Sequence, residues 1–227
     1  MKTEFPNLRN FRDFSGYRCT DGAVLKSRVF ARSDNPCSIE KSEIDELKNR
    51  DFTTIIDLRR ENEREQRPDK LAENTDFDYH PIVMNDAPYY DLGEMLEPSE
   101  IAAAYYSKLT VSSDRIAEIF RILSNAKTGV IFHCESGKDR TGTIAALLLL
   151  LCGVADDDIA EDYRLSYDRI YLDSPELLSD PTLVPMSETM NLFLERFHRE
   201  YPVTEDYFIS IGLTKKELEM IRNKIRE

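Results

Sequence analysis

Positive charge is scarce in this sequence. Lysine and arginine number 30 against 43 aspartates and glutamates, which gives the 227 residues a formal net charge of −13. Such an excess of negative charge argues against a protein that binds nucleic acid or lies on an anionic membrane. A ligand that is itself an anion would therefore have to be held by a local cluster of positive groups.

Long apolar runs and paired cysteines are also missing. The longest apolar run, residues 144–152, is about half as long as a membrane-spanning helix requires, and the N-terminus lacks the apolar core of a secretory signal peptide. The cysteines are Cys19, Cys37, Cys134 and Cys152. They form no Cys-x-x-Cys pair and have no histidines at metal-ligand spacing, so we expect neither a metal site nor a disulfide framework. The simplest interpretation is a reduced, cytoplasmic protein with no integral membrane segment.

Apolar, β-branched runs alternate with amphipathic stretches along the chain. Strands are predicted at residues 29–32, 53–58, 77–83 and 129–133. Helices are predicted at residues 38–50, 101–110, 112–126, 141–152, 157–170, 187–201 and 214–227. Residues 59–75 are predicted to be a charged connection, and Pro81 indicates an edge strand or a strand end. The order predicts an α/β fold, one domain over residues 1–227 with a mostly parallel central sheet flanked by helices and a helical C-terminal third.

Two long segments have no regular apolar pattern. Residues 84–99 contain turn-forming residues, and residues 171–186 are punctuated by prolines. We expect these segments to cover a functional site as wall and lid. Four tyrosines in or after the first segment could line a cleft for an aryl group or simply pack: Tyr89, Tyr90, Tyr105 and Tyr106.

The most informative stretch is His-Cys-Glu-Ser-Gly-Lys-Asp-Arg-Thr-Gly, residues 133–142, which lies between a predicted strand and the most apolar predicted helix. Cys134 would stand at the carboxyl end of a parallel strand, just before a helix N-terminus. Backbone N–H groups and the helix dipole converge at such a place, which binds dianions and favours a thiolate over a thiol. Arg140 is spaced to fold back over the loop and bind two phosphoryl oxygens in a fork.

The neighbours of Cys134 and Arg140 have supporting roles in this interpretation. Gly137 lets the backbone turn tightly, and the Thr141 hydroxyl is placed to donate to the cysteine sulfur when it leaves. His133 is predicted to fix the loop through a hydrogen bond to the backbone, although an ordinary core histidine fits the pattern almost as well. Four charged residues near the N-terminus could buttress the site as an ion network: Arg12, Asp13, Arg32 and Asp34.

A strand-end carboxylate could also serve the loop. Asp57 lies at the end of the predicted strand 53–58. In a parallel sheet this end lies on the same edge as Cys134. Asp57 could orient Arg140 or Lys138, as could Glu61, but a plain salt bridge at the strand end is the simpler interpretation.

Residues 133–142 resemble the Cys-x5-Arg phosphate loop of cysteine-dependent phosphatases. The Gly-Lys-Asp-Arg-Thr-Gly ending is similar to that of bacterial tyrosine phosphatase B, whose relatives include dual-specificity and phosphoinositide phosphatases. The likeness covers nearly the whole chain, at residues 10–13 with 16–17, 32–34, 57–59 with Glu63 and Glu65 nearby, 162–163 with Ser166, and 212–213. It implies a protein-tyrosine-phosphatase-like fold and metal-independent hydrolysis of phosphotyrosine in proteins or peptides, with serine/threonine phosphates or phosphoinositides as further substrates. No cofactor is implied.

The resemblance assigns roles within the loop. Cys134 would be the nucleophile that forms a phosphocysteine, and Arg140 the phosphate clamp. The remaining phosphate-binding positions are Glu135, Ser136, Gly137, Lys138 and Thr141. Glu135 and Ser136 depart from the usual pattern of the family, and an acidic residue at the rim weakens the case for highly charged inositol phosphates.

The proton donor is not decided by the sequence. The chain has no tryptophan, so the Trp-Pro-Asp loop of conventional tyrosine phosphatases is absent. Asp139 lies in the phosphate loop, where the resembled family has its candidate donor, and we prefer it. Asp86 follows the predicted strand 77–83, roughly where dual-specificity phosphatases carry theirs. Two other functions use a loop cysteine or a phosphate site, a rhodanese-type sulfurtransferase and an inactive phospho-binding module, but neither requires both Cys134 and Arg140.

Overall fold

The computed structural model describes residues 5–84, 97–170 and 187–227 and contains a five-stranded central sheet. In spatial order the strands are β1 (Arg12–Asp13), β2 (Phe30–Ser33), β5 (Gly129–His133), β3 (Phe52–Asp57) and β4 (Asp78–Pro81). β1 is antiparallel to β2, and the other neighbours are parallel. The mostly parallel sheet is thus confirmed. Pro81, which has no N–H to donate, ends the edge strand β4.

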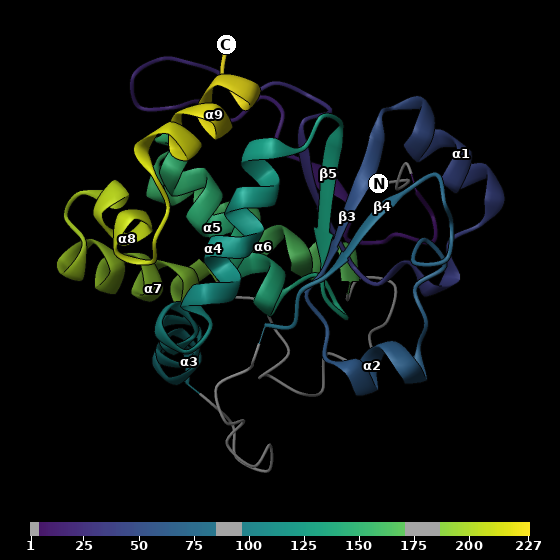
Figure 1. Ribbon diagram of the computed structural model, residues 1–227. Coiled ribbons are helices and arrows are strands. Elements are labelled where there is room, and N and C mark those ends of the chain that lie inside the picture. The colour runs from purple at the N-terminus through teal and green to yellow at the C-terminus, as the bar shows by residue number, and fades with distance from the viewer. Residues whose placement is uncertain (1–4, 85–96, 171–186) are drawn as a thin grey trace.

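Alternate residues of the central strands pack into two cores, one on each face of the sheet. Ile55 and Ile131 belong to the smaller core, which α1 (Lys41–Asn49) covers. Ile56 and Phe132 point the other way into the larger core. The helices on that face gather on the opposite side of the sheet from α1 (Figure 1). They are α3 (Pro98–Val111), α4 (Ser113–Asn125), α5 (Asp139–Cys152), α6 (Asp156–Ile170), α7 (Ser187–Glu200), α8 (Thr204–Ser210) and α9 (Lys215–Ile225).

Helix α5 lies at the centre of the larger core. It is buried from Arg140 to Cys152 and contacts α3, α6, α8, α9, β2 and β5. A helix that is apolar on all sides is stable only where neighbours cover it all round. The helix ends at Gly153, whose φ of 82° is left-handed, as predicted for the residue that terminates it.

Several predicted boundaries are wrong. The predicted helix 38–50 is a 3₁₀ turn at Pro36–Ser38 followed by α1, and α5 begins at Asp139 rather than 141. The supposed connection 59–75 contains α2 (Glu61–Gln66), and α8 was not predicted. Helix α2 is wholly polar, so it has no apolar periodicity that could reveal it. Of the two segments expected to cover the site, residues 85–96 and 171–186 lie outside the described residues.

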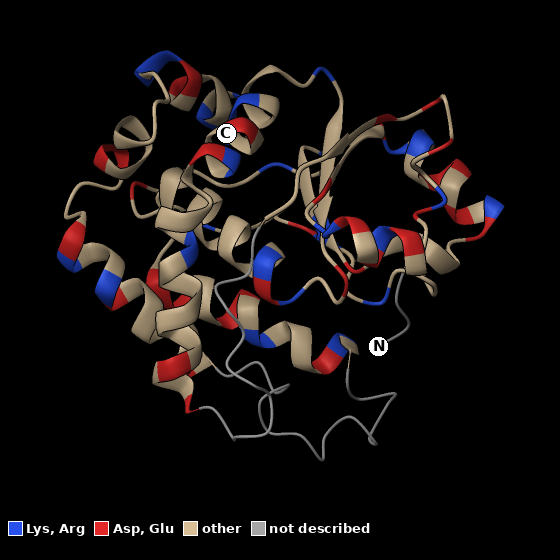
Figure 2. Cartoon of the chain, turned by 60° about the horizontal axis from the view of Figure 1, so that its bottom comes forward, with Lys and Arg blue, Asp and Glu red and all other residues tan. Residues whose placement is uncertain are grey.

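Acidic and basic residues are interspersed along the outer helices (Figure 2). The last helix is tied to the start of the fold by a β-bridge between Leu25 and Arg226. None of the helices in the described ranges is long and apolar enough to cross a membrane.

Candidate active site

The loop that carries Cys134 begins where β5 ends at His133 and closes where α5 begins at Asp139. Cys134 is 2% exposed. Gly137 has a φ of 69°, and a Cβ atom there would lie 2.4 Å from the carbonyl oxygen of Ser33. Only glycine fits this position, because the loop is pressed against the end of β2.

Two side chains from the N-terminal part of the chain hold the loop from behind. Asn10 Nδ2 donates to the carbonyl oxygens of Ser136 (3.1 Å) and Gly137 (3.0 Å). Arg32 Nη2 donates to the carbonyl oxygens of Gly137 (2.7 Å) and Lys138 (3.3 Å). Because these carbonyls are turned toward the protein, the N–H groups of the peptides that they belong to face the opposite way, into the loop. The result is a cradle of N–H donors above Cys134.

A buried ion network anchors those side chains. Asp162 of α6 accepts from Arg12 Nε (2.8 Å) and Arg32 Nη1 (2.5 Å), and all three side chains are at most 7% exposed. Burial raises the pKa of the Asp162 carboxyl, but the two guanidinium groups outweigh it and leave the pKa at about 2. The predicted network therefore exists for Arg12 and Arg32, with Asp162 at its centre. Asp13 instead accepts from the backbone N–H of Ser15 in a turn.

Arg140 is oriented by a carboxylate that the sequence analysis did not choose. Its Nη1 and Nη2 donate to Glu63 Oε2 (2.7 Å) and Oε1 (2.6 Å) in a planar fork. Burial raises the pKa of Glu63, but the hydrogen bonds from Arg140 overcome it and hold the pKa at about 2. The alternative in which Asp57 or Glu61 orients Arg140, which the sequence analysis ranked below a plain salt bridge for Asp57, is thus not the arrangement found for Arg140. Glu61 is exposed on the same helix, because residues two apart in a helix point in nearly opposite directions.

Asp57 makes the simpler strand-end salt bridge. Arg59 Nη2 donates to its Oδ2 at 2.8 Å, and the Tyr79 hydroxyl donates to the same oxygen at 2.5 Å. Burial raises the pKa of Asp57, but nearby His133 and the hydrogen bonds from Arg59 and Tyr79 hold it well below its usual value. Asp57 therefore supports the floor of the loop and does not reach Arg140.

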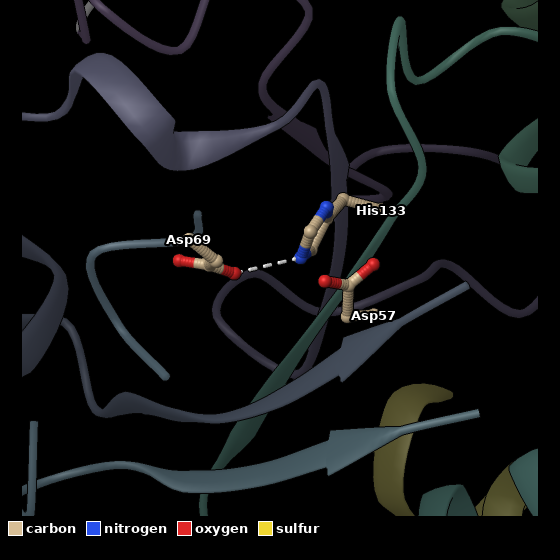
Figure 3. A group of neighbouring side chains, drawn as sticks. All are labelled: Asp57, Asp69 and His133. Atoms are coloured by element: carbon tan, nitrogen blue, oxygen red, sulfur yellow. Dashed lines mark ion pairs between the residues drawn. The ribbon is translucent and has the colours of Figure 1, made fainter. Parts of the chain in front are cut away.

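His133, the residue before Cys134, lies between the carboxylates of Asp57 and Asp69 (Figure 3). Its Nε2 is 3.0 Å from Asp69 Oδ2, and its Nδ1 is 3.2 Å from the carbonyl oxygen of Cys134. A carboxylate and a carbonyl are both acceptors, and such neighbours favour the protonated form of the ring. Burial lowers the pKa of His133, but Asp57 and Asp69 raise it to about 9. The ring is thus a cation that fixes the loop through the predicted backbone hydrogen bond. A metal at these three side chains would have to displace Arg59 from Asp57.

The rim of the loop is acidic, but its charge is compensated. Glu135 pairs with Arg67, lies 3.5 Å from Arg59 Nη1 and accepts from Asn35 Nδ2 at 3.2 Å. A cavity of about 360 Å³ opens beside Glu135 and Ser136. Glu135 therefore brings less negative charge to the mouth of the loop than the sequence suggests.

Asp139 and Thr141 lie where the loop passes into α5. The Lys138 ammonium is 3.5 Å from Asp139 Oδ1, and the Tyr105 hydroxyl donates to the same oxygen. Burial raises the pKa of Asp139, but Lys138, Lys108 and the Tyr105 hydroxyl bring it below its usual value. The Thr141 hydroxyl is buried and has no hydrogen-bond partner among the described residues, so it is available to a group inside the loop. Asp86 lies outside the described ranges.

Three residues contribute to the site although the sequence alone assigned them no role in supporting the loop: Glu63, Asp69 and Tyr105. Glu63 lies on a polar helix that has no apolar period, and Asp69 lies in the stretch interpreted as a connection. For Tyr105 the sequence suggested only that it lines a cleft for an aryl group or packs in the protein. Their partners are 34 to 77 residues away along the chain. No local spacing could reveal such pairs.

Comparisons with known proteins cover most of the chain. The model of a family described as "Tyrosine phosphatase family" matches residues 3–227. A protein of Nostoc commune named tyrosine-protein phosphatase is 32% identical over 192 residues, which are 75% of this chain and 65% of that protein. The triple specificity protein phosphatase PtpB of Mycobacterium tuberculosis is 26% identical over 196 residues, 74% of this chain and 70% of that protein. The chain thus spans just under two thirds of the length of its Nostoc relative.

A more distant likeness links the chain to a solved structure. The crystal structure of P. aeruginosa TpbA in complex with pTyr is 12% identical, with a TM-score of 0.37, over 85% of this chain and 98% of that chain.

Proposed function

Because the chain belongs to the tyrosine phosphatase family, we propose that it hydrolyses phosphomonoesters through a phosphocysteine intermediate, with phosphotyrosine in proteins or peptides as the main substrate class. The observation that supports this most directly is the loop above Cys134. Asn10 and Arg32 hold its carbonyls toward the protein, which leaves the N–H groups of the same peptides facing into the loop for a dianion. Arg140, held flat by Glu63, supplies a fork for two phosphoryl oxygens.

In the first step the Cys134 thiolate attacks phosphorus in line with the ester bond. The S–P bond forms while the P–O bond to the leaving group breaks, and the leaving oxygen takes a proton from Asp139. The N–H cradle and Arg140 bind the equatorial oxygens, on which the charge of the transition state is spread.

In the second step a water molecule attacks the phosphocysteine. The Asp139 carboxylate takes the proton from that water, the S–P bond breaks, and inorganic phosphate leaves. The sulfur departs as a thiolate, toward which the buried Thr141 hydroxyl can donate. Asp139 regains the proton that it gave up, so the cycle closes without a cofactor.

The range of substrates and the cellular compartment are part of the proposal. The pairing of Glu135 with Arg67 and Arg59 removes part of the objection to highly charged inositol phosphates. Phosphoinositides therefore stay in the proposed range beside phosphoserine and phosphothreonine. The family match over residues 3–227 supports one phosphatase domain. Cys134 is a free cysteine and must stay reduced to act, which favours a reducing compartment such as the cytoplasm.

The test is turnover of para-nitrophenyl phosphate in EDTA by the wild-type protein and by Cys134→Ser. The wild type should release phosphate, and Cys134→Ser should lose activity while still binding phosphate, because serine fits the cradle but is a far poorer nucleophile. A Cys134→Ser protein with more than about a tenth of wild-type activity would exclude the covalent mechanism. A wild type with no turnover would favour a phospho-binding module, and cyanide-dependent thiocyanate formation from thiosulfate would favour a sulfurtransferase.

A further inference from the structure

A tyrosine from the other side of the core reaches the phosphate loop at Asp139. Tyr105 lies on α3 and is 4% exposed. Its hydroxyl donates to Asp139 Oδ1, and the Tyr163 hydroxyl of α6 lies 2.9 Å from that of Tyr105. Since the Tyr105 proton is directed at Asp139, Tyr163 is the donor in the second contact. Two phenols on different helices thus form a buried series of hydrogen bonds that ends on one carboxyl oxygen.

This series of hydrogen bonds acts on a single oxygen of the Asp139 carboxyl group. Among the described residues, the contacts made to the Asp139 side chain are with Tyr105 and with the Lys138 ammonium, and both are at Oδ1. Oδ2 is therefore the oxygen on which a proton can be carried toward a leaving group. The side chain of Asp139 as a whole is 23% exposed and is therefore not closed off from solvent.

We propose that Tyr105 is a positioning residue that keeps Oδ1 of Asp139 as an acceptor, so that the transferable proton resides on Oδ2 and the carboxylate is stabilised once the proton has gone. The inference rests on the proposed function, in which Asp139 exchanges that proton. A tyrosine that served only to pack would not need a hydroxyl directed at the loop, and phenylalanine would fill the same space.

The other charged groups around Asp139 come from three elements. Lys138 and Arg140 flank it in the chain, and Lys108 reaches it from α3, one turn beyond Tyr105. Burial and the nearby Asp139 and Tyr163 raise the pKa of Tyr105 well above 10, so the phenol stays a neutral donor over the working range of the enzyme. Lys138, Lys108, Arg140 and Tyr105 all lower the pKa of Asp139. Removing the Tyr105 hydroxyl alone should therefore raise it.

The experiment is the pH profile of kcat/KM for phenyl phosphate, a substrate with a poor leaving group. Deprotonation of the general acid gives such a profile a limb that falls on its alkaline side. The lowered pKa of Asp139 places this limb at acid pH. Tyr105→Phe should move that limb to higher pH by on the order of one pH unit, because a hydrogen bond to the charged form is lost. Tyr106→Phe is the matched control on the same helix. The Tyr106 hydroxyl donates to Glu200 at 2.6 Å, away from the loop, so its removal should leave the limb in place.

Asp139→Asn and Tyr163→Phe complete the test. Asp139→Asn should remove the limb, and Tyr163→Phe should move it in the same direction as Tyr105→Phe but less far. Tyr163→Phe also keeps the proposal open to refutation if Tyr105→Phe does not fold. A limb that stays in place in both tyrosine variants, or that persists in Asp139→Asn, would overturn the inference while leaving the phosphatase activity intact. A wild type without turnover would instead refute the proposed function.

Discussion

Glu63→Gln tests whether the orientation of Arg140 matters to catalysis. In the wild type both guanidinium nitrogens donate to the Glu63 carboxylate, at 2.7 and 2.6 Å, and the two side chains are 8% and 16% exposed. Glutamine keeps one acceptor oxygen but turns an NH₂ group toward the other guanidinium nitrogen. One of the two bonds is therefore lost, and the plane of Arg140 is no longer fixed.

The size of the effect follows from the exposure of the pair. A hydrogen bond to a charged group contributes about 1.5–3 kcal/mol, and partial access to water reduces this to about 1–2 kcal/mol. If that energy is used to hold Arg140 in its transition-state geometry, kcat/KM should fall by about 5- to 30-fold. The loss should appear mainly in kcat, because the fork is matched to the equatorial oxygens of the transition state.

The assay is steady-state hydrolysis of para-nitrophenyl phosphate, with Glu61→Gln as the matched control. Glu61 lies on the same helix but is exposed, so its variant should stay within about twofold of the wild type. A Glu63→Gln protein that is also within twofold, while correctly folded, would refute the reasoning. Equal losses of activity in the two variants would mean that activity depends on the total charge of α2. The two hydrogen bonds from Arg140 to Glu63 would then have no specific role.

The other predictions concern Arg140, Asp139 and the pairing of His133 with Asp69. Arg140→Lys should lower kcat/KM by about 100-fold or more, because an ammonium cannot form the fork; a variant within about fivefold would contradict the clamp. Asp139→Asn should lose more activity on phenyl phosphate than on para-nitrophenyl phosphate, whereas equal losses would limit Asp139 to a structural role and favour Asp86. Asp69→Asn should lower the free energy of unfolding in urea by about 1–2 kcal/mol at pH 6. That difference should fade as the pH rises through about 9, because the pKa of His133 is raised in the folded state from 6.5; a pH-independent difference would contradict the pairing.

The phosphate loop was predictable because its chemistry is contiguous. Cys134, Gly137 and Arg140 lie within seven residues, between a strand and a helix with clear apolar patterns. The strand and helix types were correct for the same reason, since burial imposes a period on the sequence. The short polar helix α2 has no such period. Glu63, which the resemblance only placed near residues 57–59, could therefore not be assigned its role from the sequence.

The support behind the loop could not be derived from local pattern. Asn10 and Gly137 are 127 residues apart, and Arg12 and Asp162 are 150 apart. Their pairing is a product of the sheet order, in which β2 lies beside β5 although about a hundred residues separate them along the chain. The sequence offered charged residues near the N-terminus as candidates but could not say which acid would meet them.

Charge pairing around the loop explains how a protein with a net charge of −13 can hold a dianion. Most cations near the loop have their own carboxylate, as Arg140 has Glu63 and Arg59 has Asp57. One place breaks this rule. Arg12 and Arg32 share the single carboxylate of Asp162. This place leaves about one positive charge in excess, and Arg32 contacts the loop directly. Charges at this depth are screened little by salt, so a phosphate in the cradle is attracted although the outer surface repels it. Raising the ionic strength should for this reason weaken that long-range repulsion more than it weakens binding in the loop.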